Sequence, residues 1–97
     1  MKFATYRKTP AERKRYTISY ADWLDSGEFV QSATYFIDND TVPPLMVEGS
    51  FIQFDGLGLS FFVSGGITDE QYQLNVLMET SVGQIKEDWM TFVVEQP

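Results

Sequence analysis

The residues of this chain best suited by type to chemistry are three close pairs of carboxylates: Asp38 with Asp40, Asp69 with Glu70, and Glu87 with Asp88. Residues 38–40 offer three oxygen-bearing side chains to a calcium ion, which needs several oxygens converging from one loop. The alternative is a turn in which Asp and Asn side chains bond to their own backbone. A carboxylate pair acting on a glycosidic bond also stays open. No surrounding motif assigns any of these groups a reaction.

The chain contains neither histidine nor cysteine. A Ser-His triad around Ser60, Ser64 or Ser81 is therefore impossible, and so are disulfides and thiolate metal sites. The glycines of residues 64–66 precede no helical pattern, so we interpret them as positions of positive φ between strands and not as a phosphate-binding loop. We expect no enzyme, no metal and no cofactor.

Charge divides the chain into two unequal parts. Residues 1–15 hold six bases and one acid, a net charge of +5, whereas residues 16–97 hold one base and thirteen acids, a net charge of −12. A basic segment on an acidic body predicts contact with something acidic, such as a neighbouring copy; the alternative is a solvated chain end. The interface candidates in this segment are Lys2, Arg7, Lys8, Arg13 and Lys14.

These charges predict a basic N-terminal arm over residues 1–15 and a folded domain over residues 16–97. We expect contact with another chain to order the arm, because Phe3 and Tyr6 are its only large apolar anchors. The acidic body would repel phosphates, so we expect no nucleic-acid partner.

Length and composition indicate one small domain with a real core. The chain has 97 residues, of which 43% are hydrophobic and 15% aromatic. No apolar run approaches the roughly 18–20 residues of a membrane span, so no membrane partner is expected. The charged N-terminus does not resemble a signal peptide, which together with the missing cysteine favours synthesis in the cytoplasm.

Apolar residues alternate with period two, and turn residues interrupt them every eight to twelve positions. This pattern predicts an all-β, antiparallel sandwich of about seven strands. A β-bulge between Val30 and Ala33 would turn both side chains inward. The expected strands are residues 14–20, 28–38, 45–47, 51–54, 57–63, 71–80 and 85–95.

Tyr72 and Leu74 have the spacing of a tyrosine corner, in which a tyrosine opens a strand and its hydroxyl bonds to upstream backbone. This favours an immunoglobulin-like sandwich; the alternative is that Tyr72 is an ordinary aromatic β-residue. Trp23 and Leu24 should anchor the turn after the first expected strand. The predicted core is Ile18, Trp23, Leu24, Val30, Tyr35, Ile37, Leu59, Phe61, Val63, Leu74, Val76, Phe92 and Val94.

Several large side chains fall outside the predicted core face. Phe29, Phe62 and Trp89 are candidates for a subunit interface or for stacking on sugar rings. Because Phe36 and Leu77 are also out of phase with the core, we favour an interface.

Two stretches carry a set of motifs in a fixed order. Residues 16–30 carry a tyrosine strand, a Trp-Leu turn and a Gly-Glu pair, and a Pro-x-Glu lead-in precedes them at residues 10–12. Residues 59–83 carry a Ser-Gly-Gly turn, the Tyr-x-Leu strand and a Thr-Ser-x-Gly hairpin. Together they resemble a family of small tailed-phage virion proteins with an immunoglobulin-like sandwich. The chain departs from the family at Tyr20, where tryptophan is usual, and at residues 69–71, where glycine often occurs.

The resemblance covers roughly residues 10–94 and implies a structural role in the virion. The protein would decorate the head or act as a fibre–tail adaptor, with other virion proteins as partners and several symmetric copies, and it implies no catalytic residues. A carbohydrate- or receptor-binding module is the alternative, and a small acidic inhibitor that mimics nucleic acid is a third possibility. A receptor binder should gather its aromatic residues in loops at one end, whereas an assembly protein should place them on a sheet face or in an arm.

Overall fold

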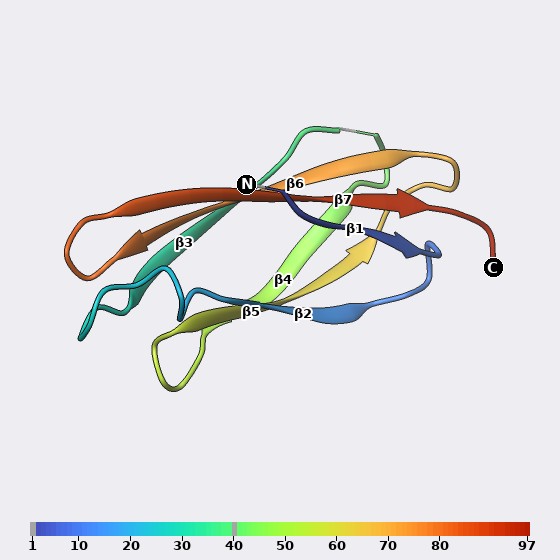
Figure 1. The fold of residues 1–97 in the computed structure, drawn as a ribbon. Helices are drawn as coiled ribbons and strands as arrows, with labels where there is room; N and C mark the ends of the chain where they lie inside the picture. Colours follow the sequence, from blue (N-terminus) through green and yellow to red (C-terminus); the bar gives the residue numbers. More distant parts are fainter. Residues whose placement is uncertain (1, 40) are drawn as a thin grey trace.

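The structure, a computed structural model, describes residues 2–39 and 41–97, with side chains from Ala4 onward. Within those residues the chain forms seven strands and no helix, which confirms the all-β prediction (Figure 1). The described part accordingly has no helix long and apolar enough to cross a membrane. The strands are β1 Lys2–Lys8, β2 Lys14–Ser19, β3 Val30–Ile37, β4 Leu45–Ile52, β5 Gly58–Gly65, β6 Gln71–Thr80 and β7 Ile85–Val94.

The strands form two sheets, which Figure 1 shows stacked as the layers of a sandwich. One sheet has the order β1-β7-β6-β3 and the other has the order β2-β5-β4. Every pairing among β2 to β7 is antiparallel, as expected. The pairing of β1 with β7 is parallel, and the sequence did not predict it.

The basic segment was expected to be ordered by another chain, and this expectation is wrong. Residues 2–8 pair with β7 of their own domain, in a register that sets Tyr6 opposite Phe92. The Tyr6 ring lies 4.7 Å from the Tyr16 ring and 5.5 Å from the Phe92 ring, measured between centroids. One aromatic anchor is enough here because two neighbouring strands supply its partners.

The core lies between the sheets and is most tightly closed at β5, β6 and β7. Most predicted core residues are buried, and Ala33, Tyr35 and Ile37 pack against them at its margin. The largest fully buried side chains among the described residues are Tyr20, Val30, Leu59, Phe61, Val63, Tyr72, Leu74, Val76, Met78, Met90, Phe92 and Val94.

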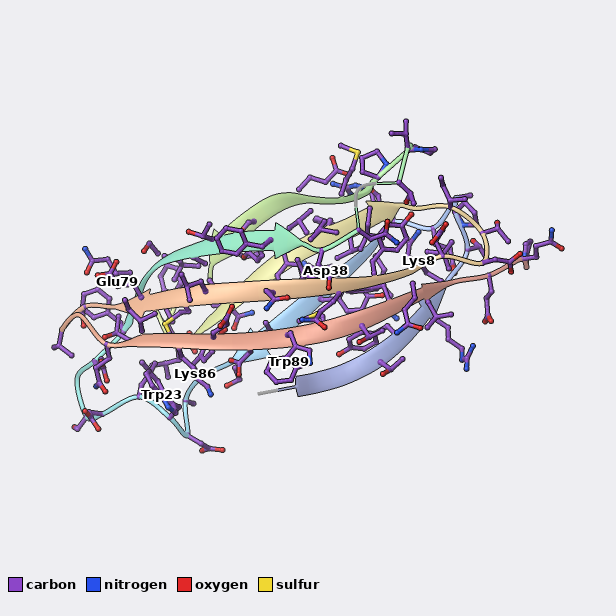
Figure 2. The ribbon with its side chains drawn as sticks, turned by 90° about the horizontal axis from the view of Figure 1, so that it is seen from above. Lys8, Trp23, Asp38, Glu79, Lys86 and Trp89 are labelled. Carbon is purple, nitrogen blue, oxygen red and sulfur yellow. The ribbon has the colours of Figure 1, made fainter. Side chains whose placement is uncertain are left out.

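The sequence predicted that Trp23 anchors the core, and this prediction is wrong. The residue is 37% exposed and does not anchor the core. The backbone N–H groups of Trp23 and Leu24 both donate to the carbonyl of Tyr20, which begins a tight turn. In that turn Tyr20 points inward with 2% exposure and supplies the anchor, while Leu24 is half-buried. The Trp23 ring instead lies 5.6 Å from the ammonium of Lys86, and Figure 2 shows the two side by side.

β-Bulges interrupt the regular pairing of β3 and β4. The register of β3 shifts between Val30 and Ser32, which confirms the predicted bulge, and Val30 is buried. The two short strands expected around Gly49 are one strand, β4, whose register shifts between Glu48 and Phe51. Gly49 has a φ of 61°, so the chain bulges there and continues in the same direction.

The tyrosine corner is confirmed. Tyr72 is fully buried near the start of β6, and its hydroxyl accepts a hydrogen bond of 3.0 Å from the N–H of Ile67 in the preceding loop. The glycines before this loop, Gly65 and Gly66, have φ values of 77° and 93°, as the sequence predicted.

Candidate assembly interface

Three of the basic interface candidates come together where β1 turns into β2. Arg7, Lys8 and Lys14 line a recess of about 110 Å³ together with Glu12 and Tyr16. The turn itself is fixed locally, because the Glu12 carboxylate accepts a hydrogen bond of 2.6 Å from the Thr9 N–H. This bond is the main reason why the pKa of Glu12 lies below its usual range. The recess therefore combines cations with a carboxylate that stays ionised.

Lys8 is directed into the protein. Its side chain lies on the inward face of β1, opposite Val94, and the residue is only 4% exposed. The ammonium donates to the carbonyls of Thr9 and Gly65, so it fastens the β1–β2 turn to the end of β5. Burial lowers the pKa of Lys8, and the nearby Glu12 carboxylate opposes that shift.

Arg13 and Phe62 form a cation–π pair on the outer face of the β2-β5-β4 sheet. The guanidinium carbon of Arg13 lies 3.9 Å from the centroid of the Phe62 ring. The Nε of Arg13 also donates to Glu48 at 3.1 Å, and the Ser64 hydroxyl donates to the same carboxylate oxygen at 2.8 Å. These two hydrogen bonds, with that of Ser64 the stronger cause, hold the pKa of Glu48 below its usual range.

Arg15 extends this surface, because it is exposed and lies opposite Phe62 in the β2–β5 register. Arg7 is exposed on the other sheet, where its guanidinium bonds the Glu95 carboxylate at 3.0 Å. The side chain of Lys2 lies outside the described residues; its backbone is opposite Trp89.

The remaining two candidates are far from the basic turn. Trp89 lies on the outer face of the four-stranded sheet, in one cross-strand row with Asn75 and Phe36 (Figure 2). Phe29 is half-exposed at the opposite end of the sandwich, against Gly56 of the β4–β5 hairpin. The candidates thus occupy three surfaces: the basic turn with the Arg13–Phe62 pair, the outer face around Trp89, and the hairpin end with Phe29.

Sequence reasoning missed an aromatic hollow at the hairpin end. Phe51, Gln53, Phe54 and Asp55 line a hollow of about 400 Å³, and Phe54 is fully exposed. The sequence did contain a signal for this hollow. Phe51 and Phe54 lie three positions apart beside the Asp55-Gly56 turn, where the alternation of apolar residues along β4 ends.

The carboxylate pairs do not assemble a site in the described part of the chain. Asp38 accepts a hydrogen bond of 2.9 Å from the Gln73 N–H, and Asn39 accepts one of 3.1 Å from the Thr41 N–H. The Asn39 contact is turn chemistry, whereas the Asp38 contact joins the end of β3 to β6. Asp40 lies outside the described residues. Asp88 points into the core, 3.2 Å from the Lys86 ammonium. No group of three or more metal-ligating side chains converges among the residues described.

Comparison with known proteins gives a family match and a likeness of fold. The sequence model of the family described as "Podophage GP4 fiber-tail adaptor protein gp77" matches residues 8–93. No curated protein matches the sequence. A solved structure of a 2,6-sialyltransferase from a Photobacterium species of the Vibrionaceae is similar, with a TM-score of 0.57 and 11% identity. That alignment covers 100% of this chain but 18% of the enzyme's chain, and at such identity it concerns the fold alone.

Proposed function

This chain belongs to the family of the podophage GP4 fiber-tail adaptor protein gp77, and from that membership we propose that it joins a fibre to the tail of a podophage virion. The family makes the protein a structural component of the virion. The match carries the proposal because it spans residues 8–93, which include β2 to β6 and all but the last residue of β7.

We propose that one partner docks on the cationic and aromatic surface formed by Arg13, Arg15 and Phe62. In this scheme the arm of residues 1–15 supplies Arg13 and Arg15 to the contact, and the body of residues 16–97 carries the arm and supplies the Phe62 ring. Glu48 holds the Arg13 guanidinium in place over the Phe62 ring, so less side-chain freedom is lost on binding. Exposed charge pairs contribute only about 0–1 kcal/mol each, so the partner must also bury the ring.

We propose further that several symmetric copies are present and that they touch through the row of Phe36, Asn75 and Trp89. Phe36 is 52% exposed, and apolar surface of this kind on a sheet face is typical of interfaces.

The sandwich is, we infer, of the immunoglobulin type. The order β2-β5-β4 corresponds to immunoglobulin strands B, E and D, and the order β3-β6-β7 corresponds to strands C, F and G. The Tyr72 corner opens β6, the strand that corresponds to F, as this type requires.

The experiment places variants in the phage that encodes the chain and measures the protein in purified virions by mass spectrometry and cryo-electron microscopy. The double variant Arg13→Ala with Arg15→Ala should lower incorporation several-fold. Asp22→Asn, an exposed charge change at the other end, is the control and should not. Equal incorporation of both variants would reject this docking surface, whereas wild-type protein located away from the fibre–tail junction would reject the adaptor role.

A second candidate function, sugar or receptor binding, is favoured by the aromatic hollow. Phe54 and Phe29 are exposed in loops at one end, and Gln53 and Asp55 place polar groups beside the Phe51 ring. Saturation-transfer NMR with lactose, galactose and glucose tests it: signals that Phe54→Ala abolishes would support binding, and no transfer from the wild-type protein would reject it for these sugars.

A further inference from the structure

The two sheets leave β1, β3, β2 and β4 as edge strands. Exposed edges invite pairing with other chains, and proteins block them with charged residues, proline or bulges. Both β1 and β2 carry lysine and arginine, and β4 carries Glu48 and the bulge at Gly49. In contrast β3 has the sequence VQSATYFI, with no charged residue, glycine or proline. Among the four edge strands, β3 therefore has only the bulge at its first residues as protection.

The backbone of β3 presents hydrogen-bonding groups outward. The Asp38 N–H donates to the Gln73 carbonyl at 3.1 Å, so Asp38 faces β6. Antiparallel pairs alternate along a ladder, and in this register the amides of Phe36 and Thr34 also face β6. The amides of Ala33, Tyr35 and Ile37 then point toward the open edge.

The core is also incompletely covered beside β3. Ala33, Tyr35 and Ile37 face inward yet remain partly exposed, while their β6 partners are fully buried. Across the gap, Val47 of β4 is half-buried and Ile52 is 38% exposed. A hydrogen bond of 2.6 Å between the hydroxyls of Tyr35 and Ser50 spans this side. The opposite side, in contrast, is closed by the contact of the Tyr6 and Tyr16 rings. Side chains of an added strand would cover the open gap.

Charge indicates what kind of strand would fit. No lysine or arginine occurs between residues 16 and 85. Glu79 lies opposite Ser32 at one end of β3, and Asp38 follows the strand at the other; Figure 2 shows these two acids well apart along the molecule. Two copies pairing β3 with β3 in antiparallel fashion would bring the Asp38 end of each against the Glu79 end of the other. A second copy would therefore bring acids near acids, whereas a basic segment meets them with opposite charge, so a basic partner fits this edge better than a second copy.

We propose that β3 is the docking edge for an extended, basic segment of another protein, which joins the sheet as a fifth strand. Its backbone bonds the amides and carbonyls of Ala33, Tyr35 and Ile37, and its inward side chains cover the gap toward β4. Lysine or arginine at its ends faces Asp38 and Glu79. This edge is separate from the surface of Arg13, Arg15 and Phe62 and does not depend on the adaptor role; it adjoins the outer-face row at Phe36, which belongs to the same strand.

The test uses the wild-type protein and the dye-labelled peptide Lys-Thr-Val-Thr-Val-Thr-Val-Lys as the probe. Fluorescence anisotropy measures binding, and amide hydrogen exchange by NMR locates it. We expect slower exchange at Ala33, Tyr35 and Ile37, with no such change at Thr34. Two further peptides carry N-methyl groups on alternate backbone amides. In one peptide the methylated amides face one edge of the peptide strand, and in the other they face the opposite edge. One of them should bind about tenfold more weakly or worse, because the methyl groups remove bonds to β3; the other should bind like the parent.

Several outcomes would overturn the proposal. Equal binding of the two methylated peptides would show that backbone pairing is not the mode of contact. Equal binding of a peptide with glutamate at both ends would remove the argument from charge. No saturation at millimolar peptide would show that the edge is not a docking site. Slowed exchange of the same amides with protein concentration alone would make a second copy the occupant.

Discussion

The hydroxyl of Tyr72 accepts a hydrogen bond of 3.0 Å from the backbone N–H of Ile67, five residues earlier in the chain. The Thr41 hydroxyl contacts the same oxygen from the β3–β4 connection. One buried side chain of β6 thus joins two loops at the end of the sandwich where Lys8 also bonds Gly65. The corner therefore stabilises this end of the sandwich.

Tyr72→Phe should lower the free energy of unfolding by about 1 kcal/mol, because it leaves the Ile67 N–H without its acceptor. Urea denaturation followed by tryptophan fluorescence measures the change. Tyr35→Phe is the matched control: its hydroxyl bonds the side chain of the exposed Ser50, so its loss should be smaller. An equal loss in both variants would contradict the role given to the corner.

Gly66→Ala should destabilise the protein more than Gly83→Ala. Both glycines have a φ near 90°, so alanine is strained at either position. At Gly66 an added Cβ would also lie 2.8 Å from a methyl group of Val94, whereas at Gly83 it would meet nothing within 4 Å. Overpacking typically costs about 1–3 kcal/mol, and thermal unfolding of the two variants should show a difference of that order.

Tyr6→Ala should release β1 and cost about 2 kcal/mol or more, since it removes the ring that packs on Tyr16 and Phe92. Amide exchange of residues 4–8 measures the release. Thr5→Ala, on the outward face of the same strand, is the control and should leave the exchange slow.

Salt distinguishes this packing from an electrostatic attachment. Raising NaCl to about 1 M shortens the Debye length to about 3 Å, so a strand held by charge would be released. We expect β1 to stay protected in the wild-type protein under these conditions, and its release by salt alone would show that charge holds it.

The free energy of unfolding should decrease at acidic pH, in part because the Glu28 carboxylate becomes protonated. Its pKa is held below the usual range by hydrogen bonds from the Thr80 hydroxyl, from the Asp25 N–H and from the Gln84 amide. Because the pKa is lower in the folded state, this contribution is complete above the unfolded value of about 4.3 and is lost as the pH falls through the folded value.

Melting temperatures of the wild type and of Glu28→Gln, measured between about pH 3 and pH 7, check this prediction. The variant should melt lower at neutral pH, and the difference should shrink toward pH 3. A difference independent of pH would mean that the carboxylate charge is not responsible. Glu79→Gln, at an exposed position, is the control.

The sequence predicted strands well wherever one face is continuously buried. β6 occupies residues 71–80, as expected, because Tyr72, Leu74, Val76 and Met78 alternate without interruption. β1 was missed because its place depends on pairing with β7 and on the Phe92 ring, which come from the far end of the sequence. Trp23 was misplaced because periodicity does not show which residue of a turn points inward.

The candidate interface was predictable by residue type but not by arrangement. Arg13 and Phe62 were both candidates, yet only the three-dimensional structure shows that the guanidinium stacks on the ring. Lys8 was a candidate because of its charge. It is buried because it lies on the inward face of β1, a strand that the sequence did not predict. The roles of these residues in assembly stay predictions until virions carrying the variants are measured.

The parallel ladder of β1 and β7 has a mechanical consequence. Figure 1 shows both strands running in the same direction, so tension between Lys2 and Val94 would pull them lengthwise in opposite senses. The hydrogen bonds of the ladder would then bear the force together, in shear, and would not open one after another as in a hairpin pulled from its ends. A joint built in this way resists force along the strands far better than force across them.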